Sequence, residues 1–273
     1  MASTGPLTAS SRAPSPWLNP VTRLRIAIVV TVLAIWEVTA DSGILLREVV
    51  PSLVVIGRSL AVLLFVPDMK VSWAGFAFSM PAFYWHLYVT LSEVAIALAL
   101  GGVAGLAVGV VLGADPFLSR ALERYFYYLG PTPKIVFFPV LIMWFGVGPE
   151  SKIAMGTLSA FFPLVLSAAA AMREIDRVLI RVGQSFRLSG WQMAMKIYLP
   201  AMREPIVNGV RLGLGVALIG VLLAETKLSN KGVGFMIIDA YNTFDMPRMY
   251  AVLLVLFVIA IGANTLVGRA SRL

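Results

Sequence analysis

Residues 86–113 read HLYVTLSEVAIALALGGVAGLAVGVVLG, and this stretch decides the class of fold. It holds one carboxylate, Glu93, and no lysine or arginine, and it exceeds the roughly 20 apolar residues that a helix needs to cross a bilayer. The rest of the chain is similar, since 59% of its 273 residues are hydrophobic, 13% are charged and its mean hydropathy is +0.87. Soluble domains carry roughly 25% charged residues. We therefore predict an all-α membrane protein with about six transmembrane helices.

Five further apolar runs complete the predicted spans. They are residues 26–40, about 125–145, 153–172, 205–224 and 249–268. Three prolines and Lys134 interrupt the second of these runs. Residues 53–66 contain Arg58 and are too few for a span, which favours an outer interfacial helix. The aromatic stretch 68–81 is expected at the outer membrane–water boundary.

The distribution of basic residues predicts the orientation of these helices. Lysine and arginine concentrate in the cytoplasmic segments of membrane proteins, and with the amino terminus inside, the larger share of them falls there. Both termini are therefore expected in the cytoplasm. The predicted division is a disordered tail at 1–22, a first transmembrane helix and outer interfacial segment at 23–84, a transmembrane core at 85–268 and a cytoplasmic end at 269–273. A cleaved secretory signal that ends near residues 38–40 is the alternative for the first run.

The composition also excludes several kinds of chemistry. The chain has no cysteine and one histidine, His86, which excludes disulfides, thiolate catalysis and multi-histidine metal sites. Its formal charge of +8 does not imply nucleic acid, because the loops of membrane proteins carry this bias. The sequence has no GxxxxGK[ST] phosphate-binding loop, so ATP chemistry has to come from another polypeptide. We expect neither an enzyme nor a metal or cofactor bound by this chain.

Glycines recur at every fourth position of the first stretch and again later in the chain. They are Gly101, Gly105, Gly109 and Gly113, and then Gly209 and Gly213. On a helix this spacing forms a groove without side chains, along which a second helix can approach closely. Such a groove serves either packing within one chain or an interface that slides between subunits.

Residues 173–204 form the longest polar stretch in the second half of the chain and are predicted to face the cytoplasm. Arg173, Arg177 and Arg181 are four residues apart and would share one helical face. A solvated loop would explain these arginines. It does not require the apolar side chains that accompany them, which are Phe186, Leu188, Trp191, Met193 and Met195. An exposed amphipathic segment of this kind fits the groove of a partner protein.

The same segment carries a recognisable spacing: Arg181-Val182-Gly183, then Arg187, then Ile197-Tyr198-Leu199-Pro200. Other stretches accompany it, namely LIMWFGVG at 141–148, SKI at 151–153, AFFP at 160–163, GVRLGLG at 209–215, AE at 224–225 and GVG at 232–234. From about residue 85 onward the chain thus resembles the membrane subunit of a type I ABC importer, in the family of sulfonate, taurine and nitrate permeases. In that family the loop opens Glu-Ala-Ala, continues with a Gly and closes Ile-x-Leu-Pro. Here Arg181 replaces the Glu and Arg187 replaces the Gly.

The resemblance implies a type I ABC importer permease fold of the MetI-like kind over 85–268, with 173–204 as its coupling loop. The loop would form two short helices, about 176–186 and 190–198, and the second would sit in a groove of a separate ATPase. The implied partners are ABC ATPase subunits that bind ATP and Mg, a periplasmic or lipid-anchored substrate-binding protein, a second copy of this chain and membrane lipid. The implied location is the inner membrane of a bacterial cell, and no nucleic acid is expected.

Two sets of residues are candidates for function. Those expected to contact the ATPase are Arg181, Val182, Gly183, Phe186, Arg187, Leu188, Trp191, Ile197, Leu199 and Pro200. Those expected along a substrate path are Glu93, Trp144, Phe145, Phe161, Phe162 and Glu225. A carboxylate inside a span is costly and usually has a functional or paired role. The alternatives are lipid contact or core packing for the aromatic residues, a structural hydrogen bond for Glu225 and a place near the outer interface for Glu93.

Sulfonates, taurine or nitrate are the first expectation for the solute. A thiamine-precursor pyrimidine or another small heterocycle is the alternative, which Glu93 favours. Two other classes of protein compete with an importer subunit: a secondary transporter or channel, and an intramembrane enzyme. The segment 173–204 distinguishes the first of these, because its deletion would leave the flux through a secondary transporter intact.

Overall fold

The computed structural model describes residues 19–43, 49–73 and 76–270. Its elements in chain order are α1 (Pro20–Ser42), α2 (Leu53–Phe65), β1 (Met69–Trp73), β2 (Phe76–Met80), α3 (Ala82–Ala114), α4 (Pro116–Leu129), the 3-10 turn η2 (Lys134–Phe137), α5 (Phe138–Phe145), α6 (Pro149–Arg173), α7 (Arg177–Ser185), α8 (Gly190–Met193), the π-helical turn η3 (Ala194–Tyr198), α9 (Leu199–Ala201), α10 (Arg203–Lys227), α11 (Val233–Asn242) and α12 (Met246–Ala270). Most of the predicted tail at 1–22 and the last residues of the end at 269–273 lie outside the described residues.

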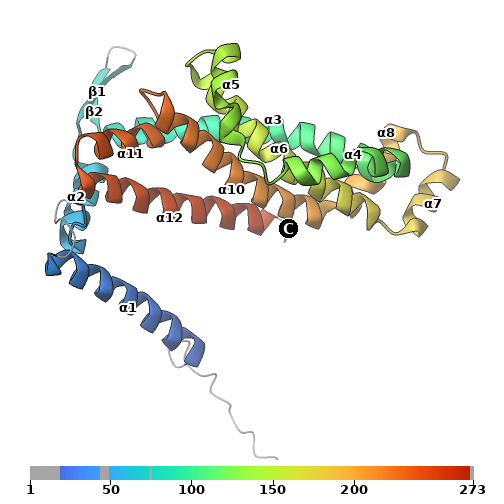
Figure 1. Cartoon of the computed structure of the whole chain (residues 1–273). Coiled ribbons are helices and arrows are strands. Elements are labelled where there is room, and N and C mark those ends of the chain that lie inside the picture. Colours follow the sequence, from blue (N-terminus) through green and yellow to red (C-terminus); the bar gives the residue numbers. More distant parts are fainter. Residues whose placement is uncertain (1–18, 44–48, 74–75, 271–273) are drawn as a thin grey trace, which may run out of the picture.

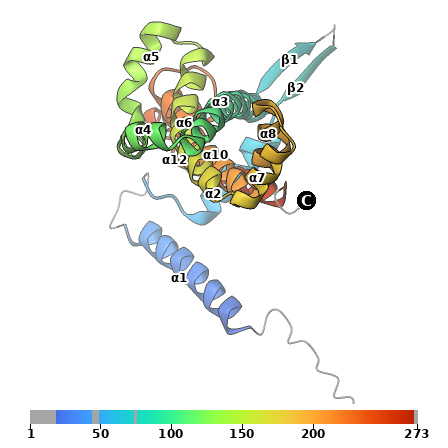
Figure 2. The same ribbon diagram turned by 90° about the vertical axis from the view of Figure 1, so that its right-hand side faces the viewer.

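Three long helices, α3, α6 and α10, form the centre of the molecule, and α12 runs along the side of α10 (Figure 1). Their contact is made by small and branched side chains: Val94 and Ala97 of α3, Ala160 and Leu164 of α6, and Ala217 and Val221 of α10. Figure 2 shows the same helices nearly end-on, with the β1–β2 hairpin and α1 projecting from the bundle. This arrangement places α11 and the hairpin at one end and α7 and α8 at the other (Figure 1).

The glycines of α3 face α6 within the same chain. A Cβ atom added at Gly109 would lie 2.5 Å from both the Val165 carbonyl oxygen and the Ala168 Cβ. A Cβ at Gly105 would lie 2.8 Å from the Leu164 Cβ. Separations this short are far inside van der Waals contact, so a side chain cannot be placed there. The backbones of α3 and α6 therefore approach more closely than any residue other than glycine would allow. Of the two interpretations of the glycine groove, the structure shows packing within one chain along this face.

The predicted span at about 125–145 is broken within the stretch that its prolines and Lys134 interrupt. The chain instead forms α4 and then η2 with α5, and the two parts are bent by 90°. The bend falls at residues 130–133, where Pro131 and Pro133 supply no backbone donor and the Lys134 ammonium donates to the Gly130 carbonyl oxygen. Four described helices, α3, α6, α10 and α12, are long and apolar enough to span a membrane, or five spans result if the bent pair is one of them.

The first predicted span forms a helix, α1, but it is not among those four. It carries Arg23, Arg25, Glu37 and Asp41, and most of its side chains are exposed. It meets the rest of the chain at its carboxyl end. There the Trp36 indole donates to the Pro51 carbonyl oxygen at 3.1 Å and the Glu37 carboxylate accepts from the Leu53 amide at 2.9 Å. The count of six spans therefore stays a prediction.

The segment before α3 is more structured than its sequence indicates. The short helix predicted at 53–66 is confirmed as α2. The stretch expected only as a boundary segment at 68–81 forms an antiparallel hairpin, in which Met69 pairs with Met80 and Trp73 with Phe76. Valine, phenylalanine and tryptophan residues alternate with smaller or polar ones in this stretch. Residues of these types favour strands, which accounts for the hairpin.

Candidate functional site

At one end of the bundle, α7 and α8 with η3 form a helical hairpin, which we call the α7–α8 hairpin (residues 177–198). The two short helices expected at 176–186 and 190–198 are thereby confirmed. Local capping explains where each one begins. The Asp176 carboxylate accepts from the Val178 amide at 2.8 Å, and Ser189 and Gln192 form a reciprocal capping box.

The inner face of the α7–α8 hairpin is closed by Gly183. A Cβ at this position would collide with the ends of the Met193 and Ile197 side chains, so these two flexible side chains would have to move for α7 to stay packed on α8 and η3. At Arg187, where the family resemblance expects glycine, the backbone takes a left-handed φ of 48°. Glycine adopts this conformation without a steric penalty, and arginine does not. The structure thus accounts physically for the glycine that the loop motif carries at this position.

The outer face of the α7–α8 hairpin exposes an apolar surface. Phe186 is 76% exposed and Trp191 is 72% exposed, and Val178 and Val182 lie on the exposed side of α7 one turn apart. Leu199 is also exposed, whereas Leu188 and Ile197 are half-buried. Large aromatic side chains concentrated on one small projecting element are typical of a protein-binding surface.

One residue predicted on this surface lies elsewhere. Arg173 is the last residue of α6, and its guanidinium forms a bidentate ion pair with Glu123 of α4, at 2.5 and 2.6 Å. It also donates to the Ser119 hydroxyl at 3.2 Å. The prediction that Arg173, Arg177 and Arg181 share one helical face is therefore wrong, because α6 ends at Arg173 and the chain turns before α7 begins at Arg177.

At the opposite end of the bundle, side chains from α3 and α10 hold the start of α11. The Gly232 amide donates to His86 Nδ1 at 3.0 Å, and the Val233 amide donates to the Thr90 hydroxyl at 2.7 Å. The Gly234 amide donates to Glu225 Oε2 at 2.6 Å. The first amides of a helix have no partners within it, so these three side chains satisfy donors that would otherwise be orphaned.

Glu225 is the centre of this arrangement, which we call the α11 latch (His86, Thr90, Glu225 and residues 232–234). Its side chain is fully buried, and its Oε1 accepts from the Thr90 hydroxyl at 2.7 Å. A carboxylate at a helix amino terminus is stabilised by the helix dipole. Gly232 has a φ of 98°, a conformation that L side chains rarely adopt, which fixes glycine at the turn into α11.

Beside the latch lies a cavity of about 400 Å³ between α3, the start of α6 and residues 230–231. We call it the outer cavity because it lies at the end of the bundle away from the α7–α8 hairpin. Glu93 and Lys152 line it, and they are only 3% and 4% exposed. Glu93, Glu225 and Lys152 are close enough to interact electrostatically. Two of the residues predicted for a substrate path, Glu93 and Glu225, are thus brought together.

The predicted aromatic path residues do not join this group. Trp144 is 74% exposed on the surface of α5. Phe162 packs with Phe161 and Phe126, and Lys134 lies over its ring at 5.2 Å. Phe145 and Phe161 line a separate apolar cavity of about 590 Å³, which touches the outer cavity at Ile96 and Ile153.

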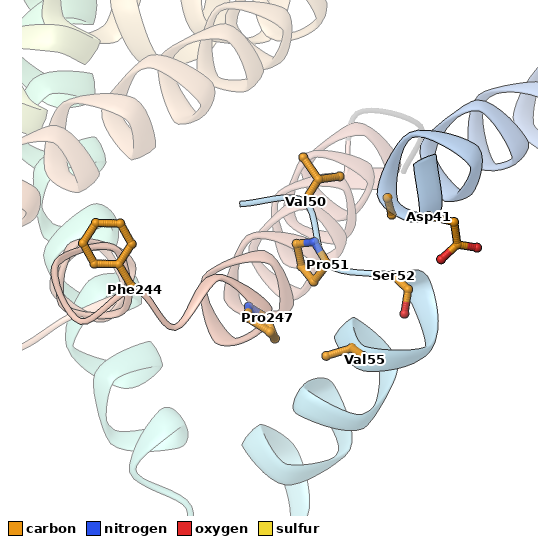
Figure 3. Close-up of a pocket in the computed structure, with 8 residues that line it drawn as sticks. Asp41, Val50, Pro51, Ser52, Val55, Phe244 and Pro247 are labelled. Atoms are coloured by element: carbon orange, nitrogen blue, oxygen red, sulfur yellow. The ribbon is translucent and has the colours of Figure 1, made fainter. Parts of the chain in front are cut away.

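Another cavity, of about 450 Å³, lies where α1 and α2 meet the turn before α12 (Figure 3). Figure 3 shows Asp41 and Ser52 on one side of it and Phe244 and Pro247 on the other. Its single charged lining residue, Asp41, is exposed, so this cavity offers a ligand fewer fixed polar groups than the outer cavity does.

Sequence reasoning missed three residues of the latch and the outer cavity. In the sequence His86 stands out only as the single histidine, Thr90 is not singled out, and Lys152 directly precedes the predicted span at 153–172. Thr90 and Glu225 are 135 positions apart in the chain, and no local pattern joins them. The similarity of residues 151–153 and 232–234 to the family was the one available signal, because both stretches lie at this end of the bundle.

The fold and the two ends together define a class of protein: a helical membrane protein with buried charged side chains at one end and a helical hairpin with an exposed aromatic surface at the other. The chain belongs to the family described as "Binding-protein-dependent transport system inner membrane component", whose model matches residues 97–273. It is an ABC importer permease of the sulfonate, taurine and nitrate group, a multi-pass inner-membrane transport protein and not an enzyme.

Several curated relatives are similar to the chain. The putative aliphatic sulfonates transport permease protein SsuC of Bacillus subtilis is 28% identical over 84% of this chain and 78% of its own length. The taurine transport system permease protein TauC of Escherichia coli is 31% identical over 66% of each chain. The nitrate import permease protein NrtB of Leptolyngbya laminosa is 24% identical over 68% of this chain and 66% of its own.

A solved structure agrees with the fold. A chain of the MetNI methionine ABC transporter in an inward-facing conformation superposes with a TM-score of 0.62 at 21% identity. The match covers 70% of this chain and 95% of that one. The predicted type I ABC importer permease fold is thereby confirmed.

Proposed function

We propose that this chain is the transmembrane subunit of an ATP-driven importer for a small solute, most simply a sulfonate, taurine or nitrate. The observation that supports it best is the exposed apolar face of the α7–α8 hairpin on a chain that belongs to this permease family. The names of the relatives favour these solutes. A riboflavin transport system permease of Chloroflexus aurantiacus, 29% identical over 58% of this chain, keeps a heterocyclic solute as the second candidate.

In this proposal two copies of the chain form the pore, two ATPase subunits bind ATP and Mg, and a substrate-binding protein delivers the solute. Both termini and the α7–α8 hairpin face the cytoplasm. Contact with the ATPase is assigned to Arg181, Val182, Gly183, Phe186, Arg187, Leu188, Trp191, Ile197, Leu199 and Pro200. When the ATPases close on ATP, the docked hairpins move together, and the helices rock between inward-open and outward-open states. A modest differential affinity for the two states suffices to bias such an equilibrium.

Reconstitution tests the proposal. The chain is purified with its ATPase, inserted into proteoliposomes and supplied with the binding protein and radiolabelled taurine, ethanesulfonate, nitrate or riboflavin. We expect accumulation of one of these solutes that requires ATP, the ATPase and the binding protein together. Accumulation at the same rate by the chain alone would identify a secondary transporter and contradict the proposal.

A further inference from the structure

The outer cavity contains a carboxylate oxygen without a partner. Glu93 is 3% exposed, and its Oε2 is the one buried side-chain polar atom of the described residues that has no hydrogen-bond partner. Buried polar groups in folded proteins are almost always satisfied, since an unpaired one is costly. Because Glu93 lines a cavity of about 400 Å³, a ligand in that cavity can supply the missing donor.

A buried cation faces the same cavity from the other helix. Lys152 of α6 is 4% exposed, yet it forms no ion pair with Glu93. The other charged groups nearby are Glu225, which the α11 latch engages and whose side chain also contacts that of Glu93, the exposed Glu150 and the exposed Lys231 at the rim. The cavity therefore presents one anionic and one cationic group, both held by packed helices and neither neutralised by direct contact with the other.

These charges select among ligand types. A simple anion would meet Lys152 but would leave Glu93 unpaired and would be repelled by it. A simple cation would satisfy Glu93 and leave Lys152 without a counter-ion. A small solute with both an amino group and an acidic group satisfies both residues, and charge-assisted hydrogen bonds of this kind are the stronger ones. Trp85, Val89 and Ile96 supply an apolar wall for the short carbon chain between the two groups.

We infer that the outer cavity is a binding site for a small zwitterion, with its amino group on Glu93 and its acidic group on Lys152 and Lys231. The inference rests on the proposed function and narrows it, because it names the charge pattern of the solute. The cavity lies at the end of the bundle away from the α7–α8 hairpin, next to the latch that holds α11 (Figure 1). A bound solute would thus contact α3 and α6 and the turn that leads into α11.

A single cysteine in the cavity reports occupancy. The chain has no cysteine, so Ser92→Cys introduces a unique thiol among the lining residues. The Ser92 hydroxyl bonds only within its own helix, to the Val89 carbonyl oxygen, so the substitution is mild. The rate of modification by N-ethylmaleimide is measured on the assembled complex over one range of concentrations of 2-aminoethanesulfonate (taurine), ethanesulfonate or ethylammonium.

We expect 2-aminoethanesulfonate to protect the thiol at a concentration about tenfold or more below that needed for either single-charge analogue. Glu93→Gln should abolish its advantage over ethanesulfonate, and Lys152→Gln should abolish its advantage over ethylammonium. Lys227→Gln, which removes a positive charge at the same end but outside this cavity, should change neither. Size-exclusion elution of each variant monitors the fold.

Three results would overturn the inference: equal protection by the zwitterion and ethanesulfonate, an advantage that survives Glu93→Gln, or a thiol that no solute protects or no reagent reaches. None of these three results would contradict the proposed function. ATP-driven accumulation of an anion by the same complex would persist, which separates failure of the zwitterion site from failure of the importer assignment.

Discussion

Replacing Trp191 with Asp should detach the ATPase from this chain while the membrane fold persists. Trp191 is 72% exposed on the α7–α8 hairpin, so its loss disturbs little of the chain's own packing. A buried charge in place of a central aromatic anchor typically costs about 2–4 kcal/mol of binding free energy, which weakens association about 30- to 1,000-fold. The measurement is the amount of ATPase that co-purifies with the tagged chain, together with ATP-driven uptake.

A matched substitution serves as the control. Phe244 is also 72% exposed, but it lies between α11 and α12. This is the opposite end of the bundle from α7 and α8 (Figure 1), so Phe244→Asp should leave ATPase binding unchanged. Its φ of 56° is one that aspartate tolerates better than phenylalanine, so the control should fold. If Trp191→Asp keeps the complex assembled and transport active, the α7–α8 hairpin is not the docking element.

Replacing Glu225 with Ala should destabilise the outer end of the bundle strongly. The change orphans the Gly234 amide and leaves the Thr90 hydroxyl with only the more distant His86 carbonyl oxygen as acceptor, both in a buried site. Each unsatisfied buried group costs about 1–3 kcal/mol. Glu225→Gln keeps one acceptor oxygen and should lose less. Thermal unfolding in detergent, followed by fluorescence-detected size exclusion, gives the order of stability: wild type, Gln variant, Ala variant.

A double-mutant cycle then shows whether the α11 latch acts as a unit. Thr90→Val and Glu225→Ala remove two ends of one hydrogen bond, so their combined effect should be smaller than the sum of the single effects. The exposed Glu174→Ala serves as the control and should shift stability by less than about 0.5 kcal/mol. Strict additivity, or an Ala variant as stable as wild type, would mean that the latch does not hold α11.

Much of this architecture follows from local sequence signals. The apolar run at 86–113 predicts a long helix, and its glycines predict a close helix contact, which α6 supplies. Asp176 and Ser189 stand where capping residues begin short helices, so the two helices of the hairpin need no distant contact to be anticipated. The exposed aromatic surface of the hairpin could be predicted because Phe186 and Trp191 contrast with the polar residues around them.

The remaining features depend on contacts between distant segments. Lys152 looks like a loop residue until the first turn of α6 packs against α3 and buries it. The α11 latch joins residues more than 130 positions apart. The 90° bend between α4 and α5 follows from Pro131 and Pro133, whose presence signals a break but not its angle. Tertiary packing determines the burial of Lys152, the formation of the latch and the angle of the bend. The periodicity of the sequence does not reveal this packing.

One introduced cysteine can show on which side of the membrane the α7–α8 hairpin lies. The same cysteine can show whether the ATPase covers the hairpin. Ser185→Cys places a unique thiol on the exposed end of α7 and is treated with a membrane-impermeant maleimide, with Asn242→Cys marking the opposite end. We predict that Ser185→Cys reacts in inside-out vesicles stripped of ATPase, is protected when ATPase is added back, and stays unreactive in right-side-out vesicles. Reaction from the outer face, or a rate that ATPase leaves unchanged, would contradict the assignment of this chain as a permease driven through its hairpin.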